Sequence, residues 1–251
     1  MGPTILHIHR GMVLAALVLA GTAAAEPRTL RFATIAPDGT LWARQARAFG
    51  QEVETATVGQ VRVKWYFGGA TGDDRQTRQY IQEGKLDGMA SGACGAMSPA
   101  LFVTNVVGLF RNRDEATYVL RKIRSTVNEE MRASGFVDLG LASFGMAVLF
   151  SRTPVRSLAD LQRDTYWYWD VHQVGVAHLR AMGVHVRPLP VTAVARAYDS
   201  GQIDGFIVSP TAALAFQWST QARYFNDLQL GFAPTCLVIS STAMDQLTLD
   251  Q

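Results

Sequence analysis

Twice along this chain, short strand-like runs alternate with stretches of helical periodicity. In the first half, the strand-like runs cover residues 29–35, 60–67 and 86–91. In the second half, the corresponding runs cover residues 165–169, 184–189 and 203–209. Parallel strands need long crossover connections, which are usually helices, so this order indicates parallel sheets with helices on their faces. The sequence therefore predicts two α/β units of similar design.

The third strand of each unit begins with the same short pattern. Gly84-Lys85-Leu86-Asp87-Gly88-Met89 corresponds to Gly201-Gln202-Ile203-Asp204-Gly205-Phe206. In both copies a glycine ends a helix, and an Asp-Gly pair follows at the start of the strand. Ligands of open parallel sheets bind beyond the carboxyl ends of the strands, so two such sheets that face each other predict a hinged cleft.

Three local patterns give more detailed expectations. Thr71-x-x-Asp74 resembles a capping box for a helix that is closed by Gly84. Residues 114–133 predict one long helix, and residues 136–152 contain two strand-like stretches with little charge.

The N-terminal residues predict a secretory signal peptide and not a part of the fold. A basic patch that ends at Arg10 precedes an apolar run over 12–20, and Ala23 and Ala25 form an A-x-A cleavage signal. The run is shorter than the roughly 20 residues that a membrane-spanning helix needs, and an uncleaved anchor is the alternative. We therefore expect cleavage after Ala25 and a periplasmic protein.

Composition and motifs exclude several classes of function. With 48% hydrophobic residues the chain can bury a sizeable core, and its net charge of +2 predicts no broad basic surface for nucleic acid. We expect no metal and no cofactor, because the five histidines show no ligand spacing and no phosphate-binding loop is present. We expect no enzyme, because the chain lacks the G-x-S-x-G motif. A hydrolase with Cys94 as nucleophile is the alternative from another class.

The two cysteines, Cys94 and Cys236, lie far apart in the sequence. Export permits a disulfide, but their spacing does not decide whether one forms. Two separate buried thiols are the expectation.

Residues 164–170 read DTYWYWD. A strand alternates its side chains, so Trp167 and Trp169 face one way while Tyr166 and Tyr168 face the other. Packing in a core is the ordinary role of such rings.

Several segments, taken in order, resemble the DctP-type periplasmic solute-binding receptors of tripartite ATP-independent periplasmic (TRAP) transporters. The resemblance covers residues 29–247, and its best local matches are FGGATGDDR (67–75), EGKLDGMASG (83–92), LFRNRDEA (109–116), SRTPVRSLADL (151–161), MGVHVRPLP (182–190), SGQIDG (200–205) and PTCLVISSTAMDQL (234–247). It implies a two-domain periplasmic binding protein fold with two parallel-rich sheets, two strands that cross between the lobes, and closure over a small solute. It also implies transient docking at a membrane permease; a monomer is expected.

We expect the chain to divide into four parts. Residues 1–25 are the signal peptide, 26–140 form lobe I, 141–230 form lobe II, and 231–251 hold a crossing strand and a truncated C-terminal region. Family members continue into a further helix, so the chain is either a fragment or lacks that helix.

The same resemblance predicts an unusual binding site. An arginine that binds the ligand carboxylate in most members corresponds to Trp167, a second arginine aligns near Met146, and an asparagine aligns near Val208. A buried carboxylate without a paired cation costs several kcal/mol. We therefore expect a small organic ligand that is more apolar than the family's usual acids.

Two sources of positive potential would weaken this expectation. Arg44, Arg75 or Arg78 could reach the cleft, although each is more often a solvated helix residue. The N-terminus of the helix after Thr40 could also favour an anion.

Weaker candidates for ligand contacts complete the site. They are Trp169, Asp38, Trp42, Ser91 and Phe144. The alternatives are turn chemistry for Asp38 and core packing for Trp169 and Phe144. Two further functions share the fold: a periplasmic carrier of an apolar or lipid-like ligand with a non-permease partner, and a remnant that binds nothing.

Overall fold

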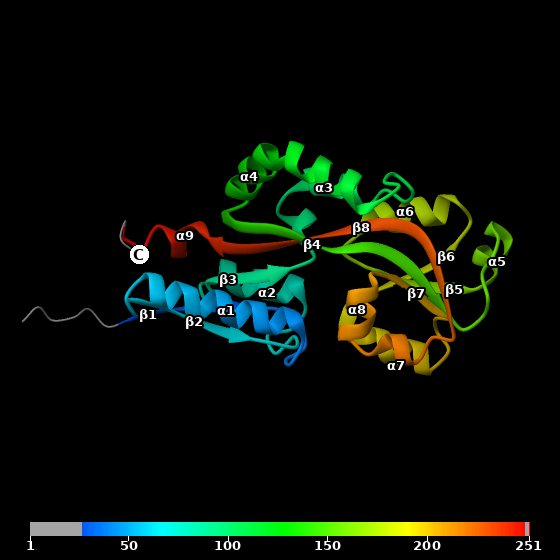
Figure 1. The fold of residues 1–251 in the computed structure, drawn as a ribbon, viewed down its shortest axis with the longest axis horizontal. Coiled ribbons are helices and arrows are strands. Elements are labelled where there is room, and N and C mark those ends of the chain that lie inside the picture. The colour runs from blue at the N-terminus through cyan, green and yellow to red at the C-terminus, as the bar shows by residue number, and fades with distance from the viewer. Residues whose placement is uncertain (1–26, 249–250) are drawn as a thin grey trace, which may run out of the picture.

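The computed structural model describes residues 27–248 and 251, so the predicted signal peptide lies outside the described residues. The molecule is elongated, and two long strands run lengthwise through both of its lobes (Figure 1). No helix among the described residues is both long and apolar enough to cross a membrane.

Lobe I contains three parallel strands at one end of the molecule. They are β1 (Arg28–Ala33), β2 (Val61–Tyr66) and β3 (Gly88–Ser91), and β1 lies between the other two. The connecting helices are α1 (Leu41–Ala56) and α2 (Asp74–Gln82). Thr40 caps α1, because its side chain accepts from the Ala43 N–H. The expected Thr71 cap of α2 is wrong: Asp73 takes that position, and its carboxylate accepts from the Gln76 N–H.

Lobe II repeats this design at the other end. Its parallel strands are β5 (Thr165–Trp169), β6 (His185–Leu189) and β7 (Gly205–Val208). Its helices are α5 (Leu158–Arg163), α6 (Gln173–Ala181), α7 (Val194–Asp199) and α8 (Pro210–Ala215).

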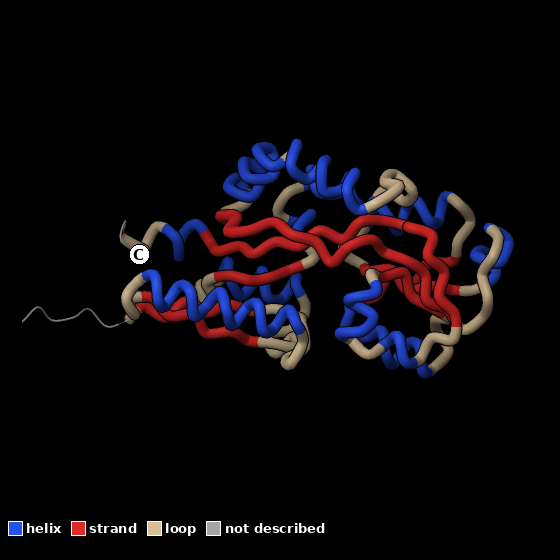
Figure 2. The backbone as a smooth tube through the Cα atoms, viewed as in Figure 1, coloured by secondary structure: helices blue, strands red, loops and turns tan. Residues whose placement is uncertain are grey.

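Two antiparallel strands, β4 (Phe136–Ser151) and β8 (Tyr224–Ser240), join the lobes. They merge the two expected sheets into one eight-stranded sheet of order β2-β1-β3-β8-β4-β7-β5-β6. Figure 2 shows the two long strands in red as they run from one lobe to the other. The two strand-like stretches expected over 136–152 are therefore one strand. Its pairing with β8 shifts register between Asp138 and Gly140, between Ser143 and Gly145, and between Ala147 and Leu149. Such bulges bend a strand, which lets β4 serve both lobes.

The single helix expected over 114–133 is two helices, α3 (Arg113–Lys122) and α4 (Arg124–Ala133). Ile123 separates them with φ −92° and ψ 5°, outside the helical range. The helical spacing of apolar residues continues across the break, so periodicity alone did not reveal it. The remaining short elements are η1 (Cys94–Ala96), η2 (Pro99–Asn105), η3 (Val191–Ala193), η4 (Trp218–Thr220) and α9 (Ser241–Met244).

The duplicated Gly…Asp-Gly pattern has the same structural role in both lobes. Gly84 and Gly201 take left-handed φ values of 70° and 71° where a helix ends. The Asp87 carboxylate accepts from the Arg31 N–H at 2.7 Å, and the Asp204 carboxylate accepts from the Thr165 N–H at 2.9 Å. Each aspartate thus fixes the third strand of its lobe to the first strand.

Cys94 and Cys236 form a disulfide, with their Cα atoms 6.0 Å apart. The expectation of two separate thiols is wrong, because β3 pairs with β8 and aligns Ser91 with Cys236, which brings the following η1 turn beside that strand. Pairing between strands distant in sequence is invisible in cysteine spacing. The bridge also leaves Cys94 without the thiol that the hydrolase alternative requires.

Candidate ligand-binding site

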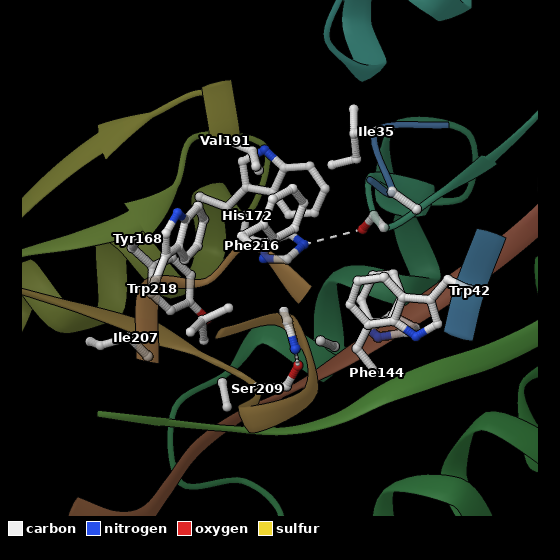
Figure 3. Close-up of a pocket in the computed structure, with 18 of the residues that line it drawn as sticks. Ile35, Trp42, Phe144, Tyr168, His172, Val191, Ile207, Ser209, Phe216 and Trp218 are labelled. Atoms are coloured by element: carbon white, nitrogen blue, oxygen red, sulfur yellow. Dashed lines mark hydrogen bonds between the residues drawn. The ribbon is translucent and has the colours of Figure 1, made fainter. Parts of the chain in front are cut away.

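A cavity lies where strand ends from both lobes meet β4 and β8 (Figure 3). We call it the aromatic cavity, and its lining residues are Thr34, Ile35, Ala36, Trp42, Ala90, Gly92, Phe144, Ala147, Trp167, Tyr168, Trp169, His172, Val191, Ile207, Val208, Ser209, Ala212, Phe216, Trp218, Phe232, Ala233 and Pro234. Its volume is about 70 Å³, small beside typical ligand sites of roughly 300–1,000 Å³. A ligand must therefore be compact, or the lobes must separate to admit it.

Aromatic rings form most of the wall. Trp42 and Phe144 contact each other with ring centroids 4.4 Å apart, and Figure 3 shows them across the cavity from Tyr168 and Trp218. Trp42 comes from α1 and Phe144 from β4, so this pair extends the wall beyond one element.

Trp167 is mainly a core side chain of lobe II. It is 2% exposed, its indole N–H donates to the Leu189 carbonyl at 2.8 Å, and its ring meets Trp218 edge-on. Only part of the indole borders the aromatic cavity. Trp169, on the same face of β5, is less buried and packs against Gly92 and His172.

The alternation expected for the aromatic strand is present. Trp167 packs in a cluster with Phe150 and Phe206, whereas Tyr166 and Tyr168 pack in a separate cluster with Leu179. Tyr168 nevertheless reaches the aromatic cavity, which simple alternation did not predict.

The polar groups of the aromatic cavity are few and neutral. His172 Nε2 lies 3.2 Å from the Gly92 carbonyl oxygen, the contact drawn in Figure 3. Burial lowers the pKa of His172 to about 4, so the ring is uncharged at neutral pH. The Ser209 hydroxyl accepts from the Ala212 N–H at 3.3 Å and caps α8.

No lysine, arginine, aspartate or glutamate stands among the described residues that line the aromatic cavity. Arg44 is exposed and donates to the Gly39 carbonyl. Arg75 and Arg78 line a separate cavity together with Ser91. A ligand carboxylate in the aromatic cavity would thus lack a partner cation.

The predicted site residues fall into two groups. Trp42, Phe144, Trp167, Trp169 and Val208 line the aromatic cavity. A ligand contact for each of them stays a prediction.

Met146, Asp38 and Ser91 do not line the aromatic cavity. Met146 packs against the lobe I core, because the register shift before Gly145 changes which side chains of β4 face the cavity. Asp38 is exposed and pairs with Arg47 at 2.7 Å, and this contact lowers the Asp38 pKa. Ser91 is buried and donates to the Asp74 carboxylate. Their ligand contacts also stay predictions.

Sequence reasoning missed His172, Phe216 and Trp218. His172 follows the carboxyl end of β5, the place where parallel sheets present ligand contacts, so its position could have identified it. Phe216 and Trp218 follow the short helix α8 and carry no periodic signal.

Residues 32–251 match the family model DctP, described as "Bacterial extracellular solute-binding protein, family 7". The chain belongs to this family. A curated relative, the uncharacterized protein YiiZ of Salmonella typhimurium, is 23% identical over 207 residues, which make up 80% of this chain. The chain spans 63% of the length of that relative.

Solved TRAP receptors share the fold. DctP7 of Bordetella pertussis, an extracytoplasmic solute receptor binding pyroglutamic acid, superposes with a TM-score of 0.81 at 19% identity, covering 88% of this chain and 74% of the other. A receptor from Pseudomonas putida F1 with bound D-glucuronate superposes with a TM-score of 0.81 at 23% identity, and it covers the same shares of the two chains. The galactonate complex of DctPAm from Advenella mimigardefordensis superposes with a TM-score of 0.82 at 21% identity, covering 89% of this chain and 73% of that one. At such identities the likeness shows the fold alone.

Proposed function

We propose that this family member is an extracytoplasmic solute receptor of the TRAP type, which captures a small organic ligand for uptake through a membrane permease. Family membership and the position of the aromatic cavity between two lobes support this function. The predicted signal peptide supports a periplasmic location, where the receptor acts as a monomer that docks transiently at the permease.

In this proposal, lobe I (26–140) closes onto lobe II (141–230) around the ligand, and residues 231–251 hold the return crossing and the C-terminal region. The bulges in β4 lie next to the first boundary, where they bend the strand and locally disrupt its pairing with β8. Hinge closure around a bound solute is a common use of this architecture.

The ligand is less acidic and more apolar than the organic acids named for the similar structures. One observation carries this proposal: the described wall of the aromatic cavity is rich in rings and holds no cationic side chain. Apolar area contributes about 25 cal/mol per Å² on burial, whereas an unpaired buried carboxylate costs several kcal/mol. The physical balance thus favours a neutral, ring-bearing solute.

Isothermal titration calorimetry on the chain without residues 1–25 tests this proposal. The ligands are neutral aromatic compounds (indole, benzyl alcohol and phenylacetamide) and the acids D-glucuronate, D-galactonate and succinate. The expected result is micromolar affinity for at least one neutral aromatic compound and none for the acids. Micromolar binding of succinate, a simple C4-dicarboxylate, would contradict the apolar ligand while leaving the receptor function intact.

The same uncharged wall also supports a second candidate, a periplasmic carrier of an apolar or lipid-like ligand that serves a non-permease partner. The small cavity volume argues against a long lipid chain. Genes for permease subunits beside the gene for this chain would favour uptake, and a gene for a helical-repeat partner would favour the carrier.

A further inference from the structure

A second cavity, of about 230 Å³, opens between the lobes on the other side of β3. We call it the polar cavity, and its lining residues are Asp74, Arg75, Arg78, Met89, Ser91, Ala93, Ala96, Met97, Phe102, Val171 and Gln173. Because side chains alternate along a strand, Ala90 and Gly92 border the aromatic cavity, while Met89 and Ser91 border the polar cavity. Val171 and Gln173 come from lobe II, so both lobes contribute to it.

Asp74 is the buried acceptor of this cavity. Only 5% of the residue is exposed, although it stands in the first turn of α2. Its Oδ1 accepts a hydrogen bond from the Ser91 hydroxyl, and that hydroxyl in turn accepts from the Ala93 N–H at 2.8 Å. Its Oδ2 is buried and finds no hydrogen-bond partner among the described residues. A buried acceptor left without a donor costs about 1–3 kcal/mol, so a bound donor would relieve the carboxylate.

Arg75, Arg78 and Gln173 add hydrogen-bond donors to the cavity. Arg75 is 65% exposed at its side chain and lies 3.8 Å from the Asp170 carboxylate of lobe II. Arg78 donates to the Ala96 carbonyl at 3.1 Å, and the Gln173 amide is exposed at the start of α6. Guanidinium groups carry several N–H donors, so one contact does not exhaust either arginine.

The carboxylates and guanidinium groups around the polar cavity together disfavour a charged ligand. A cation at Asp74 Oδ2 would stand beside two guanidinium groups, and an anion would stand beside Asp74 and Asp170. A hydroxyl group carries no charge, donates one hydrogen bond and accepts others. It can donate to Asp74 Oδ2 while it accepts from an arginine or from Gln173. The Met89, Met97 and Phe102 side chains supply an apolar surface for the adjoining carbon atoms.

We propose that the polar cavity is a binding site for a small neutral polyol, with Asp74 Oδ2 accepting a hydrogen bond from one hydroxyl group and Arg75 or Gln173 donating to a neighbouring oxygen. Because lobe I supplies Asp74 and lobe II supplies Gln173, the bound polyol holds the lobes together. The site is separate from the aromatic cavity, and it does not depend on the identity of the solute bound there.

Saturation-transfer NMR and calorimetry with glycerol, erythritol, xylitol and myo-inositol test the proposal on the chain without residues 1–25. At least one of these polyols should bind saturably. Asp74→Asn should weaken binding at least tenfold, the loss of one charge-assisted hydrogen bond, and Asp74→Ala should abolish it. Asp73→Asn is the matched control, because Asp73 carries the same charge one residue away and does not line the cavity. Circular dichroism of each variant confirms the fold.

Two results would overturn the proposal: no saturable binding of any of the four polyols, or equal affinity in Asp74→Asn and the unmodified protein. Polyols also stabilise proteins by exclusion from the surface, and that effect would be the same in both proteins. Trp42→Ala separates this test from the proposed receptor function, because it should leave polyol binding unchanged while it weakens binding in the aromatic cavity.

Discussion

Desolvation shifts the pKa values of two side chains near β3, Asp74 and His172, in opposite directions. Burial raises the pKa of Asp74 to about 6, and burial lowers the pKa of His172 to about 4. Both shifts arise because a low-dielectric surrounding disfavours the charged form. The folded state therefore favours a protonated Asp74 and a neutral His172. As the pH falls from 6 to 4, the free energy of unfolding rises through Asp74 and falls through His172.

Asp74→Asn should change the pH dependence of stability. The native carboxyl binds its proton up to about pH 6, whereas an unfolded aspartate releases it near 3.9, so the native state binds more protons between these values. Stability contributed by this group is present below about pH 4 and is lost as the pH rises through 6, by about 3 kcal/mol. Relative to the unmodified protein, the variant should gain about that amount between pH 4 and pH 7.5 in urea unfolding.

His172→Gln provides the opposite control, because glutamine can still donate to the Gly92 carbonyl. The depressed pKa of His172 costs stability as the pH falls from 6.5 to 4. Removing the imidazole should therefore raise the free energy of unfolding at low pH, relative to the unmodified protein. A stability difference between the Asp74→Asn variant and the unmodified protein that is the same at both pH values would contradict the assignment for Asp74.

Trp42→Ala should weaken binding of the solute in the aromatic cavity at least tenfold. The substitution removes the ring that contacts Phe144 and lines the cavity, and burial of a large aromatic surface is worth about 2 kcal/mol or more. Calorimetry with the tightest neutral ligand of the panel measures the effect. Tyr118→Ala, at an exposed ring on α3, should leave affinity unchanged, and equal losses in both variants would argue against a role for Trp42.

At the scale of elements, β4 and β8 position the strands and side chains that form the aromatic cavity. They hold the start of each lobe's third strand, since the Ser240 N–H donates to the Asp87 carbonyl and the Arg152 N–H donates to the Asp204 carbonyl. The same two strands place Phe144 and Phe232 in the cavity wall. The disulfide then fastens η1, which directly follows β3, to β8.

Removal of this bridge by Cys94→Ala together with Cys236→Ala should lower the free energy of unfolding by about 2–5 kcal/mol, because the long loop it closes restricts the unfolded chain. Urea unfolding under oxidising conditions measures the loss. A reduced sample of the unmodified protein should shift in the same direction. An unchanged midpoint in the double variant would show that the bridge contributes nothing to stability.

At the scale of the whole molecule, one group of contacts between the lobes lies around β3. His172 reaches the Gly92 carbonyl, Trp169 lies against Gly92, and Arg75 approaches Asp170. Gly92 is essential to this approach: an added Cβ would lie 2.7 Å from Cζ3 of Trp169, well inside normal contact.

Gly92→Ala should therefore hold the lobes apart. We expect a larger radius of gyration in small-angle X-ray scattering and at least tenfold weaker binding in the aromatic cavity. Gly140→Ala is the matched control, because a Cβ there meets no atom within 4 Å and its φ is not positive. Identical scattering and affinity in the two variants would refute the role of Gly92 in closure.

The sequence by itself determined the local structure and the fold. Period-two and helical patterns located the strands and helices of both lobes, and the Gly…Asp-Gly repeat identified equivalent strand starts, because these features depend on neighbours along the chain. The resemblance to the DctP family, carried by ordered motifs, is confirmed. Trp42, Phe144, Trp167, Trp169 and Val208 line the aromatic cavity, and their ligand contacts stay predictions.

Tertiary structure alone decided the features that depend on pairing between distant strands. The bulges of β4 turned Met146 toward the lobe I core, and the β3–β8 register brought Cys94 to Cys236. Tertiary packing around Asp74 and His172 shifted their pKa values through desolvation. Strand register and side-chain burial depend on contacts between residues that lie far apart in the chain. The spacing of residues along the sequence therefore does not determine them.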